Sequence, residues 1–227
     1  MKSVTVRTSL LCAILMLGAC QTSDPYSSAG FVKLPAAPDV QTDVRYFTTD
    51  NFVGEAINGY EASLIYLTRE ARDALQRVIA DAQVFGLGVK VFDAYRPQQA
   101  VDHFVAWAED LSDIRMKARY YPNVEKANLF RDGYIAARSG HSRGSTLDLT
   151  LFDLTSGHEL DMGTPWDYFD LTSWGESDAV TVQQRANRAL LRALMTKHGF
   201  MPLREEWWHF TLENEPYPDT YFNFLVR

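Results

Sequence analysis

The sequence predicts a single α+β domain in which helices flank a central antiparallel sheet. Three observations lead to this expectation. Apolar residues recur at helical spacing in some segments and alternate with polar residues in others, the two patterns follow one another irregularly, and no internal repeat is present. We expect the domain to span residues 44–227, a length that suffices for one hydrophobic core.

Residues 1–19 are typical of a bacterial signal peptide. The basic residues Lys2 and Arg7 precede an apolar run from Leu10 to Leu17, and this run is too short to span a membrane. The run ends in Leu-Gly-Ala-Cys20, which resembles a lipobox with Cys20 as the lipidated residue. A short signal anchor and an ordinary cleavage site that happens to precede a cysteine are the alternatives.

Residues 20–43 follow as a polar stretch rich in Ser, Pro, Ala and Asp, which indicates a flexible linker between the lipid and the domain. Gln21, next to the expected lipidated cysteine, favours the outer membrane over retention at the inner one. We therefore expect an extracytoplasmic protein, anchored through Cys20 at the periplasmic face of the outer membrane. The formal net charge is −7 and no basic patch is present, which argues against a nucleic-acid partner.

Three helices are predicted from apolar spacing and end signals. The first follows Thr68 as its N-cap and stops at Gly86; the second opens at Pro97, because proline suits a first helical turn, and runs to about Leu111. A third is closed by Gly199. The apolar stripes of the first and third are Ala71, Leu75, Val78, Ile79 and Ala82, and Val182, Ala186, Ala189, Leu190, Ala193 and Leu194.

Three strands are expected at Val89–Phe92, Thr146–Phe152 and Trp207–Leu212. The second alternates clearly: its three leucines share one face, while Thr146, Asp148 and Thr150 share the other. A carboxylate inside such a strand is costly unless it is paired or bound to a metal, so Asp148 is expected to point into a polar space.

Two segments carry the candidate chemistry: Ser139-Gly-His141-Ser-Arg-Gly144-Ser-Thr-Leu-Asp148 and Glu206-Trp-Trp-His209. Catalytic zinc sites use three nitrogen or oxygen ligands and keep a position open for water, and His141, Asp148 and His209 would fill such a set. Gly144 permits a tight turn that brings His141 back beside Asp148. A single histidine is more often structural and a single strand aspartate more often faces solvent, but the two motifs together favour a metal site.

These motifs resemble the M15 zinc peptidases, and among them the VanX-type D-Ala-D-Ala dipeptidases. The shared segments are Phe92–Gln98, Ser139–Leu151, Asp161–Asp167 and Glu206–Phe210, which occur in family order between about Tyr46 and Thr211. The resemblance implies an M15 or hedgehog-like fold, one Zn²⁺ per chain held by His141, Asp148 and His209, and hydrolysis of a small D,D-dipeptide.

The resemblance also implies the roles of five further residues. Glu206 corresponds to the general base, Arg96 to the arginine that stabilises the transition state, and Ser139 and Asp167 to residues that hold the dipeptide ends. Tyr46 matches a further substrate contact more weakly, because it lies outside a strong motif.

Two features depart from a simple match. In a regular strand Glu205, not Glu206, would share a face with His209, so either a bulge or a strand that begins after Glu206 is needed. Trp166 stands where many family members carry Phe, and its larger ring would narrow or reshape the pocket.

Two other functions compete. A D,D-carboxypeptidase acting on peptidoglycan stem peptides would use the same chemistry in a more open cleft; the segment from Pro97 to Arg138 is expected to cap the site and restrict it to dipeptides. A non-catalytic zinc-binding lipoprotein is the second alternative. An exported enzyme fits recovery of D-alanine from cell-wall turnover better than glycopeptide resistance, which requires destruction of the dipeptide in the cytoplasm.

Overall fold

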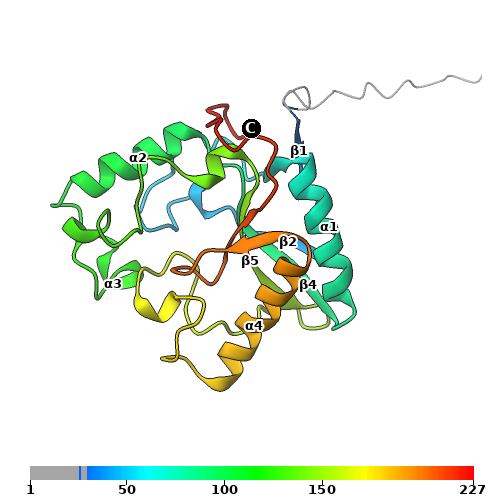
Figure 1. Ribbon diagram of the computed structural model, residues 1–227. Helices are drawn as coiled ribbons and strands as arrows, with labels where there is room; N and C mark the ends of the chain where they lie inside the picture. Colours follow the sequence, from blue (N-terminus) through cyan, green and yellow to red (C-terminus); the bar gives the residue numbers. More distant parts are fainter. Residues whose placement is uncertain (1–25, 27–29) are drawn as a thin grey trace, which may run out of the picture.

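The computed structural model describes residue 26 and residues 30–227, which fold around a five-stranded sheet in the order β2-β4-β5-β7-β6 (Figure 1). A second sheet pairs β1 with β3. The strands are β1 (Phe31–Lys33), β2 (Val40–Thr42), β3 (Tyr66–Thr68), β4 (Leu87–Asp93), β5 (Thr146–Asp153), β6 (Phe200–Pro202) and β7 (His209–Leu212). The helices are α1 (Arg69–Gln83), α2 (Gln98–Glu109), α3 (Lys117–Tyr120) and α4 (Val182–Lys197).

The expected α+β class is confirmed, with one difference in the sheet. The pairs β4–β5, β5–β7 and β6–β7 are antiparallel, as expected, but β2 runs parallel to β4 at one edge. The sheet is therefore mixed. A parallel neighbour distant in sequence leaves no turn signal by which the sequence would reveal it.

The expected boundary between linker and domain at residues 43 and 44 is wrong. Both β1 and β2 lie before it, Phe31 is fully buried, and its ring contacts the ring of Tyr95 edge to face. Strands of three residues are too short to show a period, so the polar composition of this segment concealed them. The expected signal peptide, residues 1–19, and Cys20 lie outside the described residues.

The three predicted helices are present and lie close to their predicted signals: α1 ends at Gln83, shortly before Gly86, and α2 begins directly after Pro97, whereas the short α3 was not predicted. The hydroxyl of Thr68 accepts a hydrogen bond from the backbone nitrogen of Ala71 at the start of α1, and the expected apolar stripe of α1 is buried. In Figure 1, α1 and α4 lie on one side of the molecule and α2 and α3 on the other. In the described residues no helix has the length and apolar character needed to cross a bilayer.

The buried face of α4 differs from the predicted stripe. Val182 is 73% exposed, whereas Arg188, Leu191, Leu194 and Met195 face the interior. The apolar spacing failed here because a buried arginine occupies one position of the inward face.

Strand register brings three polar residues into line. Asp148 of β5 pairs with His209 of β7 on one side and, after a register shift between Val91 and Asp93, with Asp93 of β4 on the other. This irregularity in β4 turns a second carboxylate toward the same region of the sheet. The candidate site is built on this row.

Candidate active site

His141 reaches the row from a tight turn. It lies on a short 3-10 helix, Gly140–Arg143, that Ser139 caps and that ends at Gly144 with φ +84°. A Cβ at Gly144 would collide with the ring of Phe31. The predicted turn is confirmed, and only glycine combines this backbone conformation with the close approach.

The tautomer of His141 is set by its backbone partner. Its Nδ1 lies 2.7 Å from the carbonyl oxygen of Ala94, which only accepts, so Nδ1 donates and carries the hydrogen. In the neutral ring Nε2 then presents a lone pair. This nitrogen lies 3.3 Å from Oδ1 of Asp148 and 3.3 Å from Nδ1 of His209.

The three atoms that converge here suit a cation. Oδ1 of Asp148 also lies 3.1 Å from Nδ1 of His209, and the three ligand atoms are all within 4.8 Å of one another. Oδ1 is buried and makes no hydrogen bond within the part of the chain that the structure describes. Lone pairs gathered in a buried space repel one another unless a proton or a metal ion lies between them, so the residues present fit a metal ion.

The pKa values of Asp148 and His209 reflect how closely these side chains lie. Burial alone would raise the pKa of Asp148, but the two imidazoles hold it below its ordinary value. Burial would lower the pKa of His209, yet its contacts with Asp148 and Glu206 raise it to about 9. The carboxylates of Asp148 and Glu206 therefore favour a positive charge, either a proton or a metal ion, between them and the imidazoles.

The other oxygen of Asp148 is held in place from two sides. The indole nitrogen of Trp166 donates to Oδ2 at 3.2 Å, and Nη2 of Arg96 lies 3.8 Å from it. Trp166, which was expected to narrow or reshape the pocket, does not itself line the cavity. Its buried ring instead orients the carboxylate.

Asp93, which was not among the predicted site residues, holds Arg96 in place. Nε of Arg96 donates to Oδ2 of Asp93 at 2.9 Å, and Tyr60 donates to the other oxygen at 2.7 Å. Asp93 is fully buried, and burial raises the pKa of its carboxyl. In the sequence, the only hint of this role is that Asp93 lies three residues before Arg96. The hint can be recognised only once the register shift in β4 is known, because that shift turns Asp93 toward the site.

Glu206 and His209 lie on the same side because the strand begins after Glu206. The backbone nitrogen of His209 donates to the carbonyl oxygen of Glu206 at 3.4 Å, which closes a turn, and Oε2 of Glu206 lies 3.3 Å from Nδ1 of His209. Glu205 instead pairs with Arg204 at 2.7 Å and does not line the cavity. Of the two alternatives, only Glu206 faces the candidate metal ligands.

Asp167 faces the cavity with an unusual backbone. Its φ of 59° is the only positive value at a non-glycine residue among the described residues. Tyr46 donates to its Oδ2 at 2.7 Å, and burial, followed by the nearby charge of Asp148, raises its pKa well above the ordinary value. Ser139 also lines the cavity, while its hydroxyl accepts from the backbone nitrogen of His141 at 3.3 Å.

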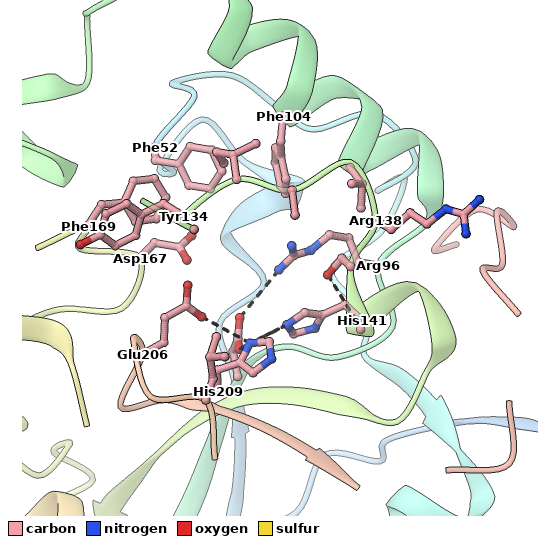
Figure 2. Close-up of a pocket in the computed structure, with 18 of the residues that line it drawn as sticks. Phe52, Arg96, Phe104, Tyr134, Arg138, His141, Asp167, Phe169, Glu206 and His209 are labelled. Carbon is pink, nitrogen blue, oxygen red and sulfur yellow. Dashed lines mark hydrogen bonds and ion pairs between the residues drawn. The ribbon is translucent and has the colours of Figure 1, made fainter. Parts of the chain in front are cut away.

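All eight predicted site residues other than Cys20 line one cavity of about 210 Å³. Figure 2 shows Arg96, His141, Glu206 and His209 converging, with Asp167 across from them. Sequence reasoning missed the apolar wall, to which the expected capping segment contributes. These lining residues are Phe52, Val101, Phe104, Tyr134, Ile135 and Phe169.

Comparisons with known proteins agree on one family. The family model described as peptidase M15, D-ala-D-ala dipeptidase, matches residues 27–227. D-alanyl-D-alanine dipeptidases are similar to this chain: that of Enterococcus faecalis is 44% identical over 187 residues, and that of Streptomyces coelicolor 46% identical over 187 residues. Each alignment covers 82% of this chain and 93% of the relative. The Enterococcus faecium protein is 38% identical over 83% of this chain and 93% of its own length.

Proposed function

The chain belongs to the M15 peptidase family, and from this we propose that it is a zinc-dependent D-alanyl-D-alanine dipeptidase that releases two D-alanines. The proposal rests on one observation above all. The candidate metal ligands, a carboxylate and a fixed arginine meet in a single cavity of about 210 Å³, which suits a very small substrate.

His141, Asp148 and His209 would hold the metal ion, one per chain. Zinc bound to them supplies a Lewis acid that polarises the scissile carbonyl and lowers the pKa of water. His141 is prepared for this role because its Nδ1 already donates to Ala94, which directs Nε2 inward.

Glu206 would transfer the proton of the attacking water, and Arg96 would stabilise the negative charge of the transition state. The carboxylate of Glu206 accepts a proton from the attacking water and delivers it to the leaving amine nitrogen. Arg96 supplies a fixed positive charge near the oxyanion that develops on the scissile carbonyl. Its ion pair with Asp93, at 2.9 Å, supports this role because it restricts the guanidinium before substrate binds.

The two ends of the dipeptide need opposite partners. Asp167 would bind the substrate ammonium, and the hydroxyl of Ser139 would donate to the substrate carboxylate. Tyr46 supports Asp167 through its hydrogen bond at 2.7 Å. Because burial keeps the pKa of Asp167 high in the free protein, an arriving ammonium would favour the ionised carboxylate.

A substrate panel tests this proposal. The zinc-loaded protein is assayed for release of D-alanine from D-Ala-D-Ala, L-Ala-L-Ala and a pentapeptide stem ending in D-Ala-D-Ala. We expect turnover of the first and little of the others. No hydrolysis of any of them would favour the non-catalytic binding protein.

A D,D-carboxypeptidase is the second candidate, and one observation favours it. A groove of about 910 Å³ adjoins the cavity and shares Gly133, Tyr134 and Leu203 with it, which offers room for a longer peptide. Turnover of the pentapeptide at a rate like that of the free dipeptide would establish this function in place of the dipeptidase.

For location, we propose export and lipid anchoring at Cys20, on the periplasmic face of the outer membrane. The order of basic residues, apolar run and Leu-Gly-Ala-Cys supports this. Such a location suits recovery of D-alanine from cell-wall turnover. Cys20→Ser should move the protein from the membrane fraction to the soluble periplasmic fraction and abolish labelling by a palmitate analogue, whereas unchanged fractionation would refute the anchor.

A further inference from the structure

A second cavity lies directly beside the active site. It has a volume of about 150 Å³ and shares Leu203 and Glu206 with the active-site cavity. Its wall also includes Arg188 of α4 and the aromatic side chains of Trp207 and Phe210. No step of the proposed hydrolysis uses this space.

Arg188 is a buried cation without an anionic partner. Its side chain belongs to a residue that is 3% exposed, its Nε donates to the carbonyl oxygen of Met162 at 2.7 Å, and its Nη1 donates to that of Trp174 at 2.9 Å. Nη2 is buried and has no hydrogen-bond partner, and no ion pair joins Arg188 to an acidic side chain of the described residues. The guanidinium therefore retains an unused donor, and Arg188 itself lines the second cavity.

Asp161 and the ring of Trp207, whose centroid lies 6.0 Å from Cζ of Arg188, compensate this charge only in part. Burial lowers the pKa of Arg188 to about 10, and Asp161 opposes the shift only in part. At neutral pH the guanidinium is still charged, and a buried charge without a counter-ion is costly. The neighbouring Arg192 and Arg204 also line the cavity, but each pairs with its own glutamate, Glu176 and Glu205 respectively.

We propose that this cavity binds a small organic carboxylate, anchored by Arg188. A carboxylate accepts hydrogen bonds in the geometry that a guanidinium offers. The apolar part of the wall, Leu203, Trp207 and Phe210, gives the short carbon chain of such a ligand a favourable contact that inorganic phosphate cannot use. A volume near 150 Å³ admits a ligand of the size of propionate or a free amino acid.

The test measures binding of propionate to the full zinc-loaded protein by NMR titration. Two variants probe the site in different ways. Arg188→Gln removes the cation, whereas Gly175→Leu fills the cavity and leaves Arg188 intact. A Cβ at Gly175 meets only the carbonyl oxygen of Arg204, at 3.9 Å, so a side chain fits there without a backbone clash.

The matched control is Arg185→Gln, which removes one positive charge from the same helix. Arg185 is exposed and donates to the backbone carbonyl oxygens of Asp178 and Val180. We expect one saturable component that weakens at least about tenfold in Arg188→Gln and Gly175→Leu and persists in Arg185→Gln. Because no turnover is involved, failure of the proposed hydrolysis would leave this result unaffected.

Three outcomes would overturn the assignment. Unchanged propionate binding in Gly175→Leu would place the ligand elsewhere, even if Arg188→Gln does not fold. Equal weakening in Arg185→Gln would indicate a general charge effect. Displacement of propionate by inorganic phosphate at equal concentration would refute the preference for an organic carboxylate.

Discussion

Nδ1 of His209 lies 3.1 Å from Oδ1 of Asp148, its direct partner across β5 and β7. The sheet register therefore sets the distance between two of the three candidate ligands before any metal binds. His141 joins them from outside the sheet, where Gly144 ends its turn. Strand pairing thus places Asp148 and His209, whereas the position of His141 depends on one tight turn.

Glu206→Gln tests the proposed base against its neighbour. The amide cannot accept the proton, so we expect kcat to fall about 10³-fold while zinc content remains unchanged. Glu205→Gln is the matched control, since Glu205 pairs with Arg204 outside the cavity, and it should retain wild-type activity. Loss of activity in the Glu205 variant alone would reverse the assignment.

Arg96→Lys tests whether a fixed fork of donors is needed or only a positive charge. Arginine can donate to Asp93 through Nε while its other nitrogens extend toward the cavity, whereas lysine has only one nitrogen for both tasks. We therefore expect kcat to fall about 10²-fold with a smaller change in KM. Steady-state kinetics on the dipeptide measures this. Arg138→Lys, at an exposed arginine that lines the same cavity, is the control, and an equal loss there would contradict a special role for Arg96.

Asp167 should make the metal-free protein less stable as pH rises. Its pKa in the folded state lies well above the value of 3.8 for a free carboxyl, so the folded state holds a proton that the unfolded state has released. Its stabilising contribution is complete below pH 3.8 and is lost as pH rises through the higher pKa of the folded state. Asp167→Asn keeps a residue that tolerates φ 59° and should remove this dependence.

Urea unfolding of both proteins over a pH series, with zinc chelated, measures the effect of Asp167. The difference in unfolding free energy between variant and wild type should grow with pH in favour of the variant. A constant difference across the series would show that Asp167 is ionised in the free protein.

Gly144→Ala tests the turn that places His141. Alanine must adopt φ +84° and collide with Phe31, so we expect a loss of about 3 kcal/mol in unfolding free energy. Gly157→Ala is the matched control: its φ is +73° but nothing lies within 4 Å of an added Cβ, so about 1 kcal/mol should be lost. Equal losses in the two variants would mean that the contact with Phe31 is unimportant.

The sequence predicted the parts of the fold that local pattern determines. The alternation in β5 placed Asp148 opposite the leucines, and Thr68 and Gly199 marked helix ends that the structure contains. Other features arise from contacts between distant segments. The parallel pairing of β2 and the shift that aligns Asp93 with Asp148 left no local trace.

The buried arginine of α4 is the clearest example of a position that pattern cannot reveal. Its guanidinium is inside because the carbonyl oxygens of Met162 and Trp174 accept its hydrogen bonds, and those segments meet α4 only in the folded chain. An arginine within a helix normally indicates the solvent face. For this reason the apolar stripe predicted for α4 does not coincide with the face of the helix that is buried.

If Asp148 and its two histidines hold the metal ion on which dipeptide hydrolysis depends, zinc content and D-alanine release must rise and fall together. Wild type and Asp148→Asn are purified in parallel, their zinc content is determined, and release of D-alanine from D-Ala-D-Ala is followed before and after chelation. We predict one zinc per wild-type chain, hydrolysis that chelation abolishes and added zinc restores, and loss of both properties in the variant. Hydrolysis by the zinc-free protein, or full zinc content in Asp148→Asn, would show that the reaction does not depend on a metal ion held by Asp148.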